Sequence, residues 1–72
     1  MMVSRITIDP TVRFGRPCIR ATRISVGDVF GWLASGMSVE EILEDFEELE
    51  LADILACYGY VARREQRIKT AA

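Results

Sequence analysis

Residues 25–43, SVGDVFGWLASGMSVEEIL, decide the fold because they contain the beginnings of two helices and the turn between them. Ser25 and Ser38 are each followed three residues later by a carboxylate side chain, which is the capping-box pattern of a helix N-terminus. Between the two boxes, Gly36 tolerates the left-handed backbone that often ends a helix. The stretch therefore predicts two short helices joined by a tight turn.

Apolar residues recur at the spacing of amphipathic helices, and after a short acidic turn they predict a third, longer helix. Gly59 lies inside this third helix, where glycine costs about 1 kcal/mol relative to alanine. We therefore expect a close packing contact or the approach of a partner at Gly59. The three stripes predicted to face the core are Val26, Val29, Phe30 and Leu33; Val39, Ile42, Leu43 and Phe46; and Leu51, Ile54, Leu55, Tyr58, Val61 and Ala62.

The residues before Ser25 have the alternation and the β-branched side chains of short strands. Residues 5–8 predict one strand, and residues 18–24 predict a bent strand or hairpin arm with Ile19 and Ile24 facing inward. The expected fold is therefore mainly α. It is a homeodomain-like three-helix helix-turn-helix core with a short N-terminal β arm or hairpin.

The chain has 72 residues, of which 50% are hydrophobic and 28% charged, an ordinary globular composition. This length indicates a single domain, residues 1–72, and excludes multi-domain enzymes, solenoids and membrane spans. Within it we expect a β arm over 1–24, the three-helix core over 25–66 and a frayed tail over 67–72. The first residues lack the apolar segment of a signal peptide, so we expect a cytoplasmic protein.

The charges are divided into blocks along the chain. Residues 1–30 have a net charge of +3, residues 31–62 contain eight acids and no base, and residues 63–72 have a net charge of +3. Such blocks indicate separate roles or a contact between opposite patches, although a solvated acidic face with basic ends would give the same pattern.

The sequence offers little for catalysis or for a metal. It contains no histidine and only two cysteines, Cys18 and Cys57, which lie too far apart to form a metal-binding pair. We expect both to be small core residues. Carboxylates four residues apart, such as Glu40 and Glu44, more often form a solvated face than a cation site. The sequence therefore predicts neither an enzyme nor a metal or cofactor site.

A helix-turn-helix fold would place the third helix in the major groove of DNA, entered by its first turns. Here that end is acidic and would repel phosphates, whereas acids near a helix N-terminus stabilise the helix itself. If the chain contacts DNA, we expect the donors to be the arginines of the β arm. These are Arg5, Arg13, Arg16, Arg20 and Arg23.

A basic segment that contains Arg63, Arg64 and Arg67 follows the third helical stripe. It could complement the helix dipole, contact nucleic acid, or insert into an acidic site of a partner. Paired carboxylates are well matched to an arginine fork. Trp32, Tyr58 and Tyr60 either close the core or lie on a dimer or partner surface, where aromatic residues are enriched.

Several motifs in the chain resemble a small bacterial and archaeal family, the domain of unknown function 433. The resemblance extends from Arg5 to Val61 and implies a homeodomain-like or winged helix-turn-helix fold. It also implies an antitoxin of a type II toxin–antitoxin pair, whose partner is a co-encoded PIN-like nuclease toxin. The motifs are Ile8-Asp9-Pro10, Gly15-Arg16-Pro17-Cys18-Ile19, Ala21-Thr22-Arg23-Ile24-Ser25-Val26, Leu33-Ala34-Ser35-Gly36-Met37-Ser38 and Glu40-Glu41-Ile42-Leu43.

The chain departs from the family pattern at four positions. Phe14 and Ala21 stand where the family usually has glycine, Glu47 where it has proline, and Glu50 where it has a Thr or Ser cap. Alanine at position 21 predicts that a left-handed backbone is not required there. The acids at 47 and 50 weaken DNA reading by the third helix.

The resemblance and the residues together predict how a PIN-like nuclease would be neutralised. Such nucleases gather carboxylates around a divalent metal, so the antitoxin should present a cation to that pocket. The toxin-binding candidates are Arg63, Arg64 and Arg67, with Tyr58, Tyr60 and Trp32 beside them. Arg16 and Arg23 of the arm are a second source of cations, or they support the bent strand. Arg5 and Arg20 complete a candidate arm surface for nucleic acid or a partner.

We also expect a homodimer, because helix-turn-helix proteins commonly bind two half-sites. The alternative function is a stand-alone DNA-binding regulator without a toxin.

Overall fold

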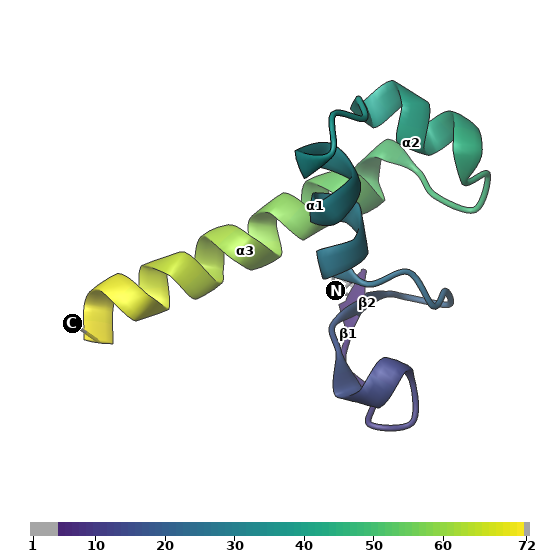
Figure 1. Cartoon of the computed structure of the whole chain (residues 1–72). Helices are drawn as coiled ribbons and strands as arrows, with labels where there is room; N and C mark the ends of the chain where they lie inside the picture. Colours follow the sequence, from purple (N-terminus) through teal and green to yellow (C-terminus); the bar gives the residue numbers. More distant parts are fainter. Residues whose placement is uncertain (1–4, 72) are drawn as a thin grey trace.

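A computed structural model describes residues 5–71 of the chain, with side chains through residue 65. Three helices follow a two-stranded antiparallel hairpin, which confirms the predicted mainly α fold (Figure 1). The strands are shorter than expected. The elements are β1 (Ile6–Thr7), a left-handed turn at Arg13–Gly15, β2 (Cys18–Ile19), α1 (Val26–Ala34), α2 (Val39–Asp45) and α3 (Leu51–Ala71).

The two predicted capping boxes are present and determine where α1 and α2 begin. The Ser25 hydroxyl accepts a hydrogen bond from the Asp28 N–H at 2.9 Å, and the Asp28 carboxylate accepts one from the Ser25 N–H at 3.0 Å. Ser38 and Glu41 make the same reciprocal pair at 3.1 and 2.8 Å. Gly36 has a φ of +106°, the left-handed conformation expected of the residue that ends α1.

The N-terminus of α3 has half of such a box. The Asp53 carboxylate accepts a hydrogen bond from the Glu50 N–H at 2.8 Å, but Glu50 has no hydroxyl to offer in return. The other Asp53 oxygen accepts a hydrogen bond from Arg5 at 2.9 Å. Asp53 is 6% exposed, so both oxygens of a buried carboxylate are satisfied.

The β arm is held against the helices by two arginines, each bound to the capping aspartate of a different helix. Arg5 binds Asp53 of α3, and Arg13 binds Asp28 of α1 at 3.0 Å. In the arm itself, Ile6 pairs with Ile19 and Thr7 with Cys18. The same two carboxylates therefore cap helices and fix the position of the hairpin.

Acid should weaken the contact between Arg13 and Asp28. Partial burial acts to raise the pKa of Asp28, but the Ser25 N–H and the Arg13 guanidinium outweigh it, so the pKa lies below its usual value of 3.8. The carboxylate therefore stabilises the fold fully above about pH 4, and this contribution is lost as the pH falls through the lowered pKa. We expect Asp28→Asn, which keeps an acceptor for the Ser25 N–H, to flatten the acid limb of a stability–pH profile.

The profile can be measured by urea unfolding at a series of pH values from neutral down into the acid range, where the carboxylate becomes protonated. Arg13→Gln should flatten the same limb, because it removes the ion pair from the other side. Acid limbs of equal slope in the wild-type chain and in both variants would contradict this assignment.

The core lies where the three helices meet the hairpin, and it confirms the predicted stripes of α1 and α2. Ile19 is buried and Ile24 half-buried, as expected, while Arg20 and Arg23 are exposed. Burial raises the pKa of Cys57 to about 11, which keeps it a neutral core thiol. The buried apolar cluster is Ile6, Ile19, Val26, Val29, Ile42, Leu49, Ile54 and Cys57.

The predicted core stripe of α3 is wrong except at Ile54. Leu51, Leu55 and Tyr58 are 54%, 58% and 44% exposed, and Val61 and Ala62 are also exposed. Apolar residues occupy two faces of this helix, so periodicity alone could not tell which of them packs inward. The side that meets the core carries Asp53, Ile54 and Cys57, with Ala56 and Tyr60 half-buried.

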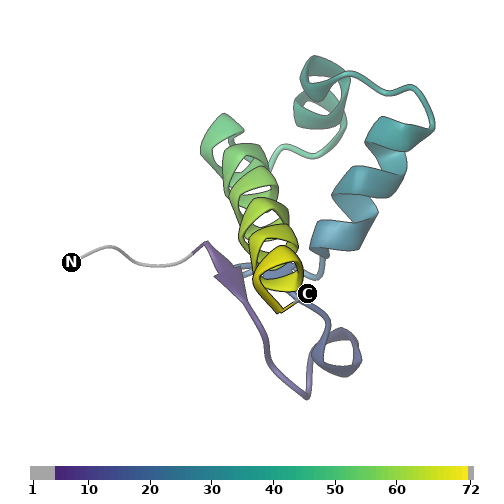
Figure 2. The same ribbon diagram turned by 90° about the vertical axis from the view of Figure 1, so that its left-hand side faces the viewer.

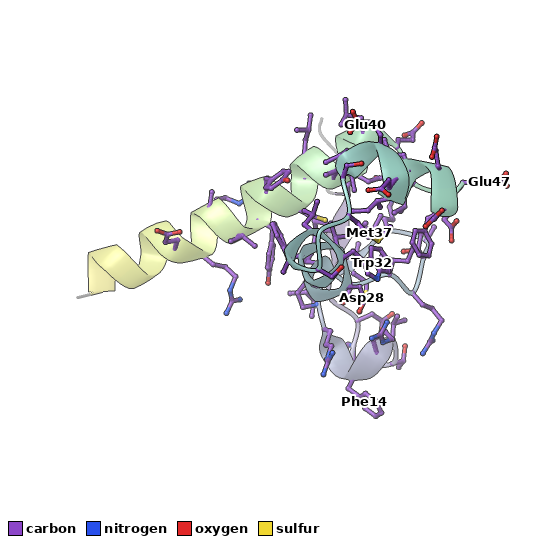
Figure 3. The ribbon with its side chains drawn as sticks, turned by 45° about the horizontal axis from the view of Figure 1, so that its top comes forward. Phe14, Asp28, Trp32, Met37, Glu40 and Glu47 are labelled. Atoms are coloured by element: carbon purple, nitrogen blue, oxygen red, sulfur yellow. The ribbon has the colours of Figure 1, made fainter. Side chains whose placement is uncertain are left out.

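The expectation that Ala21 avoids the left-handed backbone is also wrong. Its φ is +63°, because the chain reverses sharply here and the Ile19 N–H donates to the Ile24 carbonyl at 2.8 Å. The Thr22 hydroxyl closes the turn by donating to the Ile19 carbonyl. Phe14, the other departure from glycine, has a φ of +60° and is fully exposed at the tip of the arm (Figure 3).

Helix α3 passes through the fold and continues well beyond it (Figure 1). In Figure 2, α1 and α2 lie on one side of α3, and strand β1 of the arm lies on the other side, next to the lower part of the helix as drawn. The helix reaches Ala71, whereas we expected a frayed tail from residue 67. The basic segment after residue 62 is therefore carried away from the core.

Candidate functional site

The arm arginines divide into a structural group and an unpaired group. Arg5 donates hydrogen bonds to the carboxylates of Asp53 and Glu50, and these two hydrogen bonds raise the pKa of Arg5 above its ordinary value. Among the described residues, Arg16, Arg20 and Arg23 are exposed and make no ion pair. Of the predicted arm surface, Arg5 is thus engaged within the fold, and three cations are left available to a partner.

Two of these cations share a hollow in the arm of about 440 Å³. Arg16 and Arg23 line it, while Arg20 does not. Asp9 also lines it, and hydrogen bonds from the Thr11 hydroxyl and N–H lower the pKa of this carboxyl. The hollow therefore has both signs of charge, and it brings together two arginines that are seven positions apart in the sequence.

The second predicted cation source lies on α3 beyond the core. Arg63 and Arg64 are both exposed, and neither makes an ion pair with a described residue. Arg64 donates a hydrogen bond to the Tyr60 hydroxyl at 3.2 Å and lies 5.7 Å from the centre of its ring, so these two residues act together. The side chain of Arg67 lies outside the described part of the chain.

The remaining aromatic candidates do not form one surface with these arginines. Trp32 of α1 stacks on Phe46, with ring centres 4.4 Å apart, and is half-buried, so it closes the contact between α1 and α2. Figure 3 shows it on the helical body of the protein, away from the far end of α3. Tyr58 meets Phe30 edge to face at 5.4 Å and is 44% exposed, so part of this ring faces solvent.

The acidic block surrounds α2 and the start of α3. Glu40 and Glu47 point away from the helical body in Figure 3. Among the described residues, no group of three or more histidine, cysteine, aspartate or glutamate side chains is close enough to hold a metal ion. In the same part of the chain, none of the helices combines the length and apolar character needed to cross a membrane.

The sequence analysis identified the exposed arginines Arg16, Arg23, Arg63 and Arg64. It did not predict the ion pairs by which Arg5 and Arg13 hold the arm. The signal was present for one pair, because Asp28 belongs to a capping box and an arginine precedes it in the arm. No local pattern links Arg5 to Asp53, which lies 48 positions away.

The structure is that of a small protein in which a three-helix core is joined to an N-terminal β hairpin held by arginine–carboxylate pairs. The chain belongs to the family described as a protein of unknown function (DUF433), whose model matches residues 6–61. It is similar in structure to a crystallised DUF433 member from Anabaena variabilis ATCC 29413. The TM-score is 0.82 at 28% sequence identity, over 94% of this chain and 67% of that one.

One curated relative is the uncharacterized protein y4eO of Sinorhizobium fredii, strain NBRC 101917 / NGR234. The two are 41% identical over an alignment of 56 positions, and the match covers 71% of this chain. The match covers 25% of that relative, so this chain spans about a quarter of its length.

Proposed function

We propose that this DUF433 protein is a cytoplasmic antitoxin that binds and neutralises a PIN-like ribonuclease toxin, and that it is not itself an enzyme. The observation that carries the proposal is the direction of α3. This helix takes Arg63 and Arg64 beyond the core, exposed and without carboxylate partners among the described residues. Cations presented on a projecting helix suit an active site that gathers carboxylates around a metal.

The charge distribution supports the same partner. The core-proximal acids repel an acidic nuclease, while the far end of α3 attracts one, so a complex forms in one orientation. An arginine that binds two carboxylate oxygens makes a strong and geometrically specific contact. The arm hollow, with Arg16 and Arg23, is the second candidate contact with the toxin.

The first experiment is co-expression with the product of the adjacent gene, followed by co-purification and an RNA-cleavage assay. The expected result is a stable complex without cleavage activity. Failure to form a complex, or a complex that still cleaves RNA, would overturn the proposal.

Three variants then locate the contact. We expect the double variant Arg63→Ala/Arg64→Ala to weaken binding to the nuclease at least about tenfold, since a hydrogen bond to a charged group contributes about 1.5–3 kcal/mol. Arg16→Ala/Arg23→Ala tests the arm hollow in the same assay. Arg20→Ala is the control, because Arg20 lies on the arm but outside the hollow. Unchanged affinity in both double variants would contradict an arginine-mediated mechanism.

The alternative function is a stand-alone DNA-binding regulator, and the three unpaired arm arginines favour it. Against it, Glu47, Glu48 and Glu50 are exposed at the start of the predicted recognition helix, where they would face the phosphates. A promoter fragment that is shifted, with an affinity that falls steeply as salt rises, would support this function. If the chain bound its own promoter DNA only when it was in complex with the toxin, the antitoxin assignment would still hold.

A further inference from the structure

One surface of the molecule lies largely outside the core and apart from the arginines proposed to bind the toxin. It is a stripe along α3 formed by Leu51, Leu55, Tyr58 and Ala62, which we term the α3 outer face. All four residues are exposed, and the three larger side chains are 54%, 58% and 44% exposed. Their spacing of four, three and four residues places them on one side of the helix, as in the seam of a coiled coil.

The α3 outer face lacks the charges that an exposed helix normally carries. Between residues 51 and 62, Asp53 is the single Asp, Glu, Lys or Arg, and it is buried against the core and bound to Arg5. Three turns of helix therefore face solvent without a charged side chain. A contiguous exposed stripe of apolar side chains with no charge is the kind of surface that forms interfaces.

Gly59 adds a second observation on the same helix. A Cβ atom at this position would come no closer than 3.5 Å to another group, the Arg63 guanidinium, which is an ordinary contact. The close packing that we expected at Gly59 is therefore absent among the described residues. Gly59 follows Leu55 by four residues and precedes Ala62 by three, so it borders the α3 outer face. A helix from outside the chain can approach the backbone there.

The charges at the two ends of the α3 outer face indicate which partner binds to this face. Exposed acids, Glu47, Glu48 and Glu50, lie immediately before it, and exposed bases, Arg63 and Arg64, lie immediately after it. A second copy of the same helix placed antiparallel brings each acidic end against the basic end of the other. A parallel copy would bring acids against acids. A two-fold interface requires such a self-complementary surface.

We infer that the α3 outer face binds a second copy of this chain, with the two α3 helices antiparallel. The two-fold axis passes between Leu55 and Tyr58, so each Leu55 lies opposite the Tyr58 of the other copy. Leu51 then lies opposite Ala62, and Glu50 opposite Arg63. The inference does not depend on the proposed toxin, because it rests on the uncharged face and on charges within this chain.

Sedimentation equilibrium of the purified chain, without any nuclease, tests the association. The expected mass is twice the 8.1 kDa of one chain. Leu55→Glu should raise the dissociation constant about 100-fold or more, because it places two unpaired charges in the interface. The fold should be retained, since Leu55 is 58% exposed, and circular dichroism checks this. The matched control is Ile8→Glu, which alters an equally exposed apolar residue on the β arm, at 60%, and should remain dimeric.

Crosslinking tests the orientation. Leu51→Cys and Ala62→Cys are prepared as separate variants, in which the native Cys18 and Cys57 are buried. Under mild oxidation, the mixture should form a disulfide between the two variants, while each variant alone should not. Self-crosslinking of Leu51→Cys would overturn the antiparallel arrangement. A single species of 8.1 kDa at every concentration would overturn the dimer itself.

Discussion

Ile54→Ala is expected to lower the free energy of unfolding by about 3–4 kcal/mol, the largest effect of any single change considered for this protein. The Ile54 side chain is completely buried where α3 meets the hairpin and the other helices. Truncation removes its apolar contacts and leaves a cavity, since the surrounding backbone is fixed by caps and ion pairs. A domain of this length is stable by roughly 4–10 kcal/mol, so the variant should be close to unfolding.

Urea denaturation monitored by circular dichroism at one protein concentration measures the loss. The matched control is Ile8→Ala, because it removes the same atoms from an isoleucine that is 60% exposed. It should cost less than about 0.5 kcal/mol. If the two variants lost equal stability, the described core would be wrong.

Asp53→Ala is expected to cost about 2–3 kcal/mol, almost entirely through lost hydrogen bonds. Its carboxylate accepts from the Glu50 N–H at 2.8 Å and from Arg5 at 2.9 Å, and its side chain is only 8% exposed. Alanine removes the N-terminal cap of α3 and the link to the β arm at the same time. No comparable acceptor exists on the alanine side chain, so the Glu50 N–H loses its partner.

The control is Glu50→Ala, which removes the other carboxylate bound to Arg5. Glu50 is 71% exposed, and a surface pair of this kind contributes little, so the loss should be below about 0.5 kcal/mol. Asp53→Asn should lie between the two, because it keeps an acceptor for the cap but loses the charge. Equal losses at positions 50 and 53 would contradict the capping role.

The helix beginnings could be predicted from sequence because they are local. A serine and a carboxylate three residues apart contain both partners of a capping box, and Gly36 ends α1 for an equally local reason. The buried side of α3 could not be predicted, because Leu51 and Leu55 look like core residues in any periodicity argument. Tertiary contacts show which side of this helix faces inward: Asp53 binds Arg5, and Ile54 and Cys57 are buried in the core.

The candidate site was predicted in part. Arg16 and Arg23 could be identified as motif residues. The hollow that they share depends on the chain reversal at Ala21, and the sequence analysis wrongly expected no left-handed backbone at that residue. Arg63 and Arg64 could be predicted to be exposed from their block of charge. Their projection beyond the core depends on the length of α3.

The contact between Arg5 and Asp53 also sets an order of events during synthesis on the ribosome. The β arm is made before α3, and its anchor on α3 is made 48 residues later, a delay of roughly 2–10 s at ordinary rates of translation. During that interval Ile6 and Ile19 have no α3 to cover them. The newly made arm is therefore open to chaperones and proteases until the first turns of α3, which carry Asp53 and Ile54, have been made.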